Sequence, residues 1–346
     1  MTRPITTVSG LVKAGLVQAG DVPHLEAVAK DFSIRMTPHV LEQIETSDAS
    51  DPIHAQYVPS LHELNKRGDE FADPIGDVTH EKVKGITHRY PDRVLLKPTH
   101  TCQVYCRFCF RREKVGHADE ALNETELNAA LAYIRANKNI WEVILSGGDP
   151  LVLSDRRLAL LMQELDKIEH VAVVRIHTRI PMVDPARITE EFISTLKIRP
   201  AVYVALHVNH ARELTPLVRQ GFALMAENGI PLLSQTVLLK GVNDTIETLS
   251  DLMRALVANR VKPYYLHHLD KAEGVGHFRV SIAKGQHLVR QLRGRLSGLC
   301  QPTYVLDIPG GYGKVPIGPR YLGEKIQSSY EVTDYLNDLH AYADVC

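Results

Sequence analysis

The sequence predicts an α/β protein, a partial TIM-like (β/α)6 barrel that follows a helical N-terminal region. From about residue 93 onward, six short β-rich runs alternate with longer runs of helical periodicity. Such alternation indicates parallel βα units, and continuous apolar strands indicate a sheet covered by helices. An open doubly wound sheet is the rival architecture, but it favours a glycine-rich turn after its first strand. This sequence has no such turn there.

Residues 1–85 form the predicted helical N-terminal region, with apolar residues at helical spacing in Val22–Lys30 and His39–Glu45. The barrel is assigned to residues 86–300, and a C-terminal segment to residues 301–346. The predicted strands are Val94–Lys97, Glu142–Leu145, Val171–Ile176, Ala201–Leu206, Leu232–Leu239 and Pro263–His267. The helical patterns between them lie near residues 124–137, 155–168, 189–197, 212–228 and 245–259.

The composition argues against several classes of protein. Among 346 residues, Lys plus Arg total 40 and Asp plus Glu total 41, a balance that disfavours nucleic acid as a partner. No apolar run approaches the roughly 18–20 residues that span a bilayer, so neither a membrane segment nor a signal peptide is expected. Three of the five cysteines lie within eight residues, which favours a cytoplasmic protein with a metal or redox cluster over a disulfide framework.

Cys102, Cys106 and Cys109 form a CxxxCxxC triplet after the first predicted barrel strand. Three thiolates can hold three irons of a [4Fe–4S] cluster and leave the fourth iron open to another ligand. A structural zinc site is the alternative, but zinc normally takes four protein ligands, and His117 is the isolated candidate nearby. The triplet therefore favours an iron–sulfur cluster.

The triplet at this position resembles the signature of radical S-adenosylmethionine enzymes. After the second strand, a Ser-Gly-Gly-Asp turn is similar to the motif with which that family receives the methionine amino group of S-adenosylmethionine. Two glycines let backbone approach a ligand closely. By this resemblance, the residues expected to bind S-adenosylmethionine are Ser146, Gly147, Gly148, Asp149, His207 and Gln235.

Longer stretches resemble the lysine 2,3-aminomutase family over roughly residues 85 to 320. The shared segments are 89–93, 109–112, 145–149, 237–244, 263–265, 277–279 and 307–314. The resemblance implies an isomerase that moves the amino group of L-lysine from C2 to C3 to give β-lysine. It implies a [4Fe–4S] cluster, S-adenosylmethionine and pyridoxal 5'-phosphate as cofactors, and a one-electron reductant such as flavodoxin or ferredoxin as a partner.

Lys314 ends a Pro-Gly-Gly-Tyr-Gly-Lys segment. A lysine amine can form a Schiff base with an aldehyde cofactor such as pyridoxal phosphate, and the family's catalytic cofactor lysine occupies this position. Arg89, Tyr90 and Arg93 match the family's phosphate-contacting region. Arginine is suited to a phosphate because it binds the group by forked hydrogen bonds.

Three residues match the family's substrate-binding positions. Arg111 is expected to bind the substrate α-carboxylate, whereas its neighbour Arg112 is expected to be an ordinary surface residue. Asp270 and Asp307 match the two aspartates that receive the substrate ammonium, which needs carboxylates when it is buried. Two carboxylates would repel a glutamate side chain, but an arginine guanidinium also suits them.

The chain departs from the clostridial-type enzymes at three places. Thr245 replaces a cysteine beside the Asn-Asp turn, and no cysteine cluster follows Lys314. A structural zinc is therefore not expected, and whether this chain forms the homo-oligomer that the C-terminal extension supports in those enzymes is left open. His267 stands where those enzymes place a tyrosine over the cofactor, which resembles the branch that makes β-lysine for elongation factor P. A supplier of β-lysine for that factor, an arginine 2,3-aminomutase and a non-catalytic iron–sulfur protein are the alternatives.

Overall fold

A ten-stranded sheet forms the centre of the computed structural model, which describes residues 3–45, 50–116 and 121–345. The strands follow one another in chain order, parallel from β3 to β9 and antiparallel at the two edges. Their bounds are β1 Glu81–Val83, β2 Ile86–Tyr90, β3 Arg93–Thr99, β4 Glu142–Gly147, β5 Val173–Thr178, β6 Ala201–His207, β7 Leu232–Leu238, β8 Val261–His268, β9 Thr303–Ile308 and β10 Gly313–Pro316.

This sheet confirms the predicted partial barrel and extends it by a seventh parallel strand. Strand β9 pairs with β8 through Leu266 and Tyr304, and β10 then turns back along β9. Sequence reasoning places both strands in a separate C-terminal segment, whereas they complete the sheet. They bring Asp307 and Lys314 directly opposite each other.

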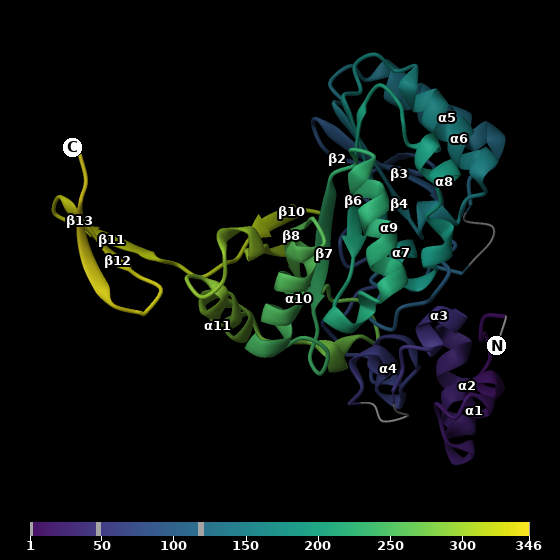
Figure 1. The fold of residues 1–346 in the computed structure, drawn as a ribbon, viewed down its shortest axis with the longest axis horizontal. Coiled ribbons are helices and arrows are strands. Elements are labelled where there is room, and N and C mark those ends of the chain that lie inside the picture. Colours follow the sequence, from purple (N-terminus) through teal and green to yellow (C-terminus); the bar gives the residue numbers. More distant parts are fainter. Residues whose placement is uncertain (1–2, 46–49, 117–120, 346) are drawn as a thin grey trace.

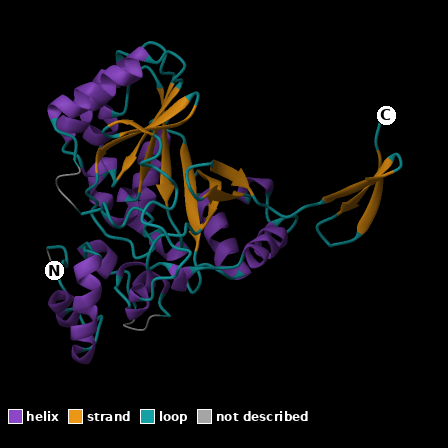
Figure 2. Ribbon diagram, turned by 180° about the vertical axis from the view of Figure 1, so that it is seen from behind, coloured by secondary structure: helices purple, strands orange, loops and turns teal. Residues whose placement is uncertain are grey.

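Helices cover the outer face of the sheet (Figures 1 and 2). They are α5 Glu124–Ala136, α6 Asp155–Asp166, α7 Ile180–Val183, α8 Glu190–Thr195, α9 Pro216–Glu227, α10 Ile246–Ala258 and α11 Ile282–Leu292. Capping side chains fix where several of them begin. Thr245, for example, accepts a hydrogen bond from the backbone N–H of Thr248 at the start of α10. Their apolar sides are buried against the strands, with Leu131, Phe222 and Leu252 each at most 1% exposed.

The N-terminal helices pack at the carboxyl end of the parallel strands (Figure 1). They are α1 Val8–Lys13, α2 Val22–Asp31, α3 Pro38–Leu41 and α4 Pro52–Tyr57. Helix α3 is shorter than predicted because single turns follow it, closed by bonds to the carbonyl groups three residues back. Backbone bonds from Tyr105 to Arg35 and from Arg107 to Gln56, both 2.9 Å, tie the cysteine loop to this region. The N-terminal region thus supports the end of the barrel where catalysis is expected.

Side chains and loops join the two edges of the open barrel. The Tyr90 hydroxyl on β2 accepts a 2.7 Å hydrogen bond from the backbone N–H of Lys314 on β10. His80 Nε2 lies 2.8 Å from the carbonyl oxygen of Gly311. A Cβ atom at Gly76, whose φ is +67°, would lie 2.5 Å from Gly311 N, so glycine is required at this approach.

A separate three-stranded antiparallel sheet projects from the body at the C-terminal end (Figure 1). It consists of β11 Leu322–Ile326, β12 Ser329–Thr333 and β13 Leu339–Ala343. Within the described residues, no helix is both long and apolar enough to cross a membrane.

Candidate active site

A cavity of about 830 Å³ lies inside the barrel, lined by residues of strands β2 to β10 and of the cysteine loop. Every site residue predicted from the sequence lines it. They are Arg89, Tyr90, Arg93, Cys102, Cys106, Cys109, Arg111, Ser146, Gly147, Gly148, Asp149, His207, Gln235, Asp270, Asp307 and Lys314. The fold therefore brings into one cavity residues that lie as far apart in the sequence as Arg89 and Lys314.

The three thiols of the cysteine loop are half-buried and line the same cavity. Burial raises the pKa of all three, that of Cys109 to about 11, and charge repulsion from Cys106 further raises the pKa of Cys102 and of Cys109. Among the described residues, no three His, Cys, Asp or Glu side chains converge on one metal position. A [4Fe–4S] cluster does not need such convergence because each cysteine ligates a different iron. His117, the candidate zinc ligand, lies outside the described residues.

A buried ion-pair triad supports the cysteine loop from the N-terminal region, and it corrects one prediction. Arg112 is buried, contacts the Glu63 carboxylate and stacks over Phe32 at 3.5 Å, so it is not a surface residue. Arg107 donates to the same carboxylate, with Nη2 at 2.6 Å from Oε2. Sequence reasoning missed this triad because Glu63 lies more than 40 residues from both arginines.

The Ser-Gly-Gly-Asp turn packs against the backbone that leads into the cysteine loop. A Cβ atom at Gly147 would lie 2.4 Å from Thr99 O, and one at Gly148 would lie 2.3 Å from Thr101 O. Both glycines are therefore required by contact within the chain. The buried Asp149 carboxylate accepts hydrogen bonds from Thr178 Oγ1 at 2.8 Å and from the backbone N–H of Arg179 at 2.6 Å, which ties β4 to β5.

Arg111 points into the cavity and is oriented by Asp77, a residue that sequence reasoning missed. Its Nε and Nη2 both lie 2.8 Å from Asp77 Oδ2, and its Nη1 donates to Ser146 Oγ at 3.1 Å. Burial acts to raise the pKa of Asp77, but Arg111, Lys97 and Arg89 outweigh burial, and the pKa lies below its ordinary value. Asp77 is therefore a carboxylate that holds a cavity-facing guanidinium in place.

Lys314 on β10, Asp307 on β9 and His267 on β8 form a cluster of polar side chains in the cavity wall. Its Nζ forms an ion pair with Asp307 and lies 3.3 Å from His267 Nδ1. Burial and the Lys314 charge lower the pKa of His267 to about 4, so this imidazole is neutral near pH 7. Burial acts to raise the pKa of Asp307. Hydrogen bonding with His267 and the charge of Lys314 outweigh burial, so this pKa lies below its ordinary value.

Among the described residues, seven that line the cavity have a buried polar side-chain atom without a hydrogen-bond partner, and three of these atoms belong to Asp or His side chains. They are Asp270 Oδ1, His207 Nε2 and His177 Nε2. A buried polar atom without a partner costs about 1–3 kcal/mol, so such atoms indicate contact with a polar ligand. Burial, followed by repulsion from Asp307, raises the pKa of Asp270 to about 7. A cationic ligand would stabilise its carboxylate. His177, on β5, is a further cavity residue that sequence reasoning missed.

Comparison with known proteins agrees with this geometry. The Radical SAM superfamily model matches residues 96–254, from β3 into α10, so the fold and the cysteine loop define a radical S-adenosylmethionine enzyme. A lysine-2,3-aminomutase model matches residues 289–334. The L-lysine 2,3-aminomutase of Clostridium subterminale is 42% identical over 293 residues, covering 85% of this chain and 70% of the relative. The chain belongs to the lysine 2,3-aminomutase family.

Two further relatives show the breadth of that family. The L-lysine 2,3-aminomutase of Acetoanaerobium sticklandii is 40% identical over 323 residues, covering 90% of this chain and 78% of the relative. A glutamate 2,3-aminomutase of Clostridioides difficile is 35% identical over 325 residues, covering 94% and 77%. Membership confirms the predicted cofactors, namely a [4Fe–4S] cluster, S-adenosylmethionine and pyridoxal phosphate.

Proposed function

We propose that this protein converts L-lysine to β-lysine by moving the amino group from C2 to C3. The observation that carries the proposal is the placement of two buried carboxylates, Asp270 and Asp307, in the same cavity as Arg111. A substrate with a carboxylate at one end and an ammonium at the other matches this charge pattern. A glutamate side chain would bring a third carboxylate to the two aspartates, which is unfavourable.

The cysteine loop and the ends of β4, β6 and β7 are proposed to hold the iron–sulfur cluster and S-adenosylmethionine. Cys102, Cys106 and Cys109 supply thiolates, and they must release protons to do so because burial raises their pKa values. The residues proposed to bind S-adenosylmethionine are Ser146, Gly147, Gly148, Asp149, His207 and Gln235. When bound, these groups supply a radical that removes and returns one hydrogen, while pyridoxal phosphate carries the amino group.

The opposite side of the cavity is proposed to bind pyridoxal phosphate. Arg89 and Arg93 face this side, and Arg93 lies 3.9 Å above the ring of Tyr90. Tyr90 also holds the backbone of Lys314, so it positions the amine that attaches the cofactor. Asp307, the ion-pair partner of Lys314, would lie beside the cofactor and is proposed to receive the substrate ammonium.

Arg111 is proposed to bind the substrate α-carboxylate. Its two bonds to Asp77 fix the plane of the guanidinium, while Nη1 faces the Ser146 hydroxyl at the end of β4. The proposed S-adenosylmethionine contact and the proposed substrate contact are therefore neighbours. Such fixed orientation is what a hydrogen transfer between two bound molecules needs.

An anaerobic assay with separate lysine, arginine and glutamate reactions tests the proposal. We expect β-lysine from lysine, identified by chromatography with mass detection, after reduction of the reconstituted protein with dithionite. Turnover of arginine in place of lysine would contradict the substrate assignment. Cleavage of S-adenosylmethionine without any amino acid isomerised would contradict the proposed reaction.

Replacing Asp270 or Asp307 with asparagine is expected to lower kcat/KM for lysine by roughly 100- to 5000-fold. Removing one partner of a buried charge pair costs on the order of 3–5 kcal/mol. Asp244→Asn is the matched control, since Asp244 pairs with Lys284 at the surface. Near wild-type turnover of lysine by both cavity variants would rule out their proposed role.

Lysine turnover is expected to depend on the ionisation of Asp270. With a pKa of about 7, its carboxyl is increasingly protonated as pH falls below that value and then loses its attraction for the substrate ammonium. We expect kcat/KM to fall about tenfold per pH unit below pH 7 and to level off above it. In Asp270→Asn, the residual activity should lack this step. A profile unchanged by the substitution would contradict the assignment.

We also propose a cytoplasmic location and a flavodoxin or ferredoxin as electron donor, because the thiols and the cluster need a reducing environment. Purified flavodoxin and ferredoxin, each reduced enzymatically, should replace dithionite in the assay. Failure of both to support turnover would remove this part of the proposal.

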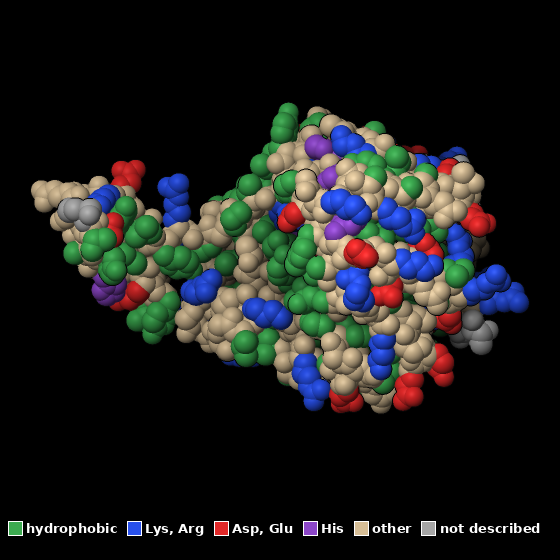
Figure 3. Space-filling view, turned by 90° about the horizontal axis from the view of Figure 1, so that it is seen from above, with side chains coloured by type: hydrophobic (Ala, Val, Ile, Leu, Met, Phe, Trp, Pro, Cys, Tyr) green, Lys and Arg blue, Asp and Glu red, His purple; other side chains and the backbone are tan. Residues whose placement is uncertain are grey.

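The projecting sheet β11–β13 supports the further proposal of a homo-oligomer. Its apolar side chains Leu322, Ile326, Leu339 and Tyr342 are each more than half exposed, and Figure 3 shows hydrophobic residues across it. Exposed apolar patches of this kind mark interfaces. Sedimentation of the full chain should show a dimer or larger species, which Leu339→Asp should dissociate. A wild-type monomer would contradict the proposal.

His267, at the position where the clostridial-type enzymes place a tyrosine, supports the proposal that the β-lysine is used to modify elongation factor P. The expected result is a β-lysyl group on that factor in cells that carry the gene and its absence after deletion, as read by mass spectrometry. A modified factor in the deletion strain would contradict it.

A further inference from the structure

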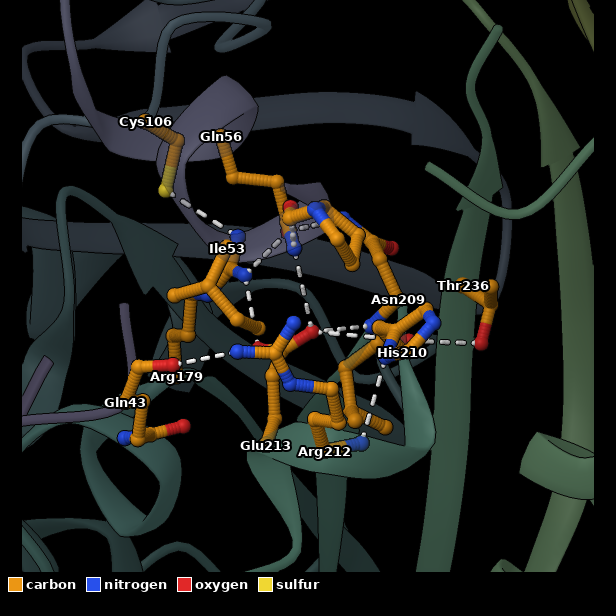
Figure 4. Close-up of polar contacts among 12 residues, drawn as sticks. Gln43, Ile53, Gln56, Cys106, Arg179, Asn209, His210, Arg212, Glu213 and Thr236 are labelled. Carbon is orange, nitrogen blue, oxygen red and sulfur yellow. Dashed lines mark hydrogen bonds and ion pairs between the residues drawn. The ribbon is translucent and has the colours of Figure 1, made fainter. Parts of the chain in front are cut away.

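Arg179 joins the cysteine loop to a buried polar network beside it (Figure 4). It directly follows β5, and its Nη1 donates a hydrogen bond to Cys106 Sγ at 3.2 Å. The residue is 6% exposed, and its guanidinium lies 4.9 Å from the ring centroid of Tyr57 and 5.3 Å from that of Phe108. A full positive charge therefore lies against a cysteine sulfur and is largely shielded from solvent.

The network fixes the direction in which this guanidinium points. Its Nη2 donates to Gln56 Oε1 at 2.6 Å and to Glu213 Oε2 at 2.7 Å. The other oxygen of Glu213 accepts hydrogen bonds from two backbone N–H groups in the loop after β6, at 2.8 and 2.9 Å. Nη2 donates to Gln56 and Glu213, and each of these side chains is fixed by further hydrogen bonds. Nη1 therefore stays directed at Cys106.

We propose that Arg179 sets the reduction potential of the iron–sulfur cluster through its hydrogen bond to Cys106. This inference rests on the proposed function, in which Cys106 is a cluster ligand. Reduction adds one electron from a low-potential donor to the cluster and breaks no bond to the protein. The added negative charge is shared with the ligand sulfurs, so a cationic N–H donor at one of them stabilises the reduced form.

Glu213 acts in the opposite direction because its negative charge offsets that of Arg179. Replacing the two residues one at a time should therefore shift the reduction potential of the cluster in opposite directions. Removing the Arg179 charge should make the cluster harder to reduce, and removing the Glu213 charge should make it easier. Loss of packing or of cluster content alone gives no such reversal, and this distinguishes control of the potential from a purely structural role.

The experiment is an anaerobic redox titration of the reconstituted protein, followed by electron paramagnetic resonance of the reduced cluster. In Arg179→Gln, we expect the ratio of reduced to oxidised cluster at a fixed potential to fall about tenfold. For a one-electron couple this is a shift of about 59 mV to lower potential. Arg179→Lys retains the charge but not the fork, so its shift should be smaller. Glu213→Gln should shift the potential upward.

Arg212→Gln is the matched control, because Arg212 lies in the same region and pairs with Asp51 rather than with a cysteine. Its cluster potential should equal that of the wild type. An unchanged potential in Arg179→Gln with full iron content would overturn the proposal. A downward shift in both Arg179→Gln and Glu213→Gln would also overturn it.

A measurement on the unmutated protein covers the case in which Arg179→Gln does not take up iron. Protein labelled with 15N-arginine should show nitrogen hyperfine coupling to the reduced cluster, and absence of that coupling would overturn the proposal. Failure of the underlying assignment is distinguishable from both results. If Cys106→Ala retained the full iron content, Cys106 would not be a ligand and the proposed function itself would need revision.

Discussion

Replacing any one of Cys102, Cys106 and Cys109 with alanine is expected to abolish the iron–sulfur cluster and all turnover. In the proposed assignment these three thiolates would be the whole protein contribution to the cluster, so the site would have no spare ligand. The structure places the three sulfurs together in a loop pinned by Arg35 and Gln56. Iron and sulfide analysis after anaerobic reconstitution should give close to four of each in the wild type.

Cys300→Ala is the matched control for this prediction. Cys300 is 4% exposed and packs in the hydrophobic core, apart from the residues that line the cavity. Its replacement should leave iron and sulfide contents unchanged. Full cluster content in any one of the three loop variants, or zinc in place of iron after strictly anaerobic preparation, would contradict the assignment.

Replacing Lys314 with alanine is expected to remove covalently attached pyridoxal phosphate and to abolish isomerisation. The amine of Lys314 lies in the cavity, where Asp307 and His267 contact it and Tyr90 fixes its backbone. No other lysine lines the cavity among the described residues. Borohydride treatment followed by peptide mapping should therefore find the cofactor on the peptide that contains Lys314.

Lys284→Ala provides the comparison, because Lys284 also pairs with an aspartate but does so on the surface with Asp244. It should retain the cofactor and the activity. Lys314→Ala should keep its iron content, which separates loss of pyridoxal phosphate from loss of fold. Reductive trapping of the cofactor on a different lysine would show that the assignment is wrong.

The features that the sequence predicts correctly are the local ones. Alternating strands and helices identify the barrel, because hydrophobic periodicity reflects burial of each element by itself. Each of three motifs consists of a few adjacent residues, namely the cysteine triplet, the glycine turn and the segment that ends in Lys314. That the cysteine loop and the glycine turn lie near each other also follows, because parallel strands place their carboxyl ends at one side of the sheet. The sequence thereby determines the class of chemistry.

The partners of these residues depend on the tertiary structure. The neighbours of Arg112 in the chain predict an ordinary surface residue, yet the fold buries it against Glu63 and Phe32. Asp77 and Arg111 are 34 residues apart in the sequence, and the fold joins them. The register of β9 and β10 decides that Asp307 faces Lys314. A charge costs free energy when it is buried without a partner, and only the folded chain determines which distant segment supplies that partner.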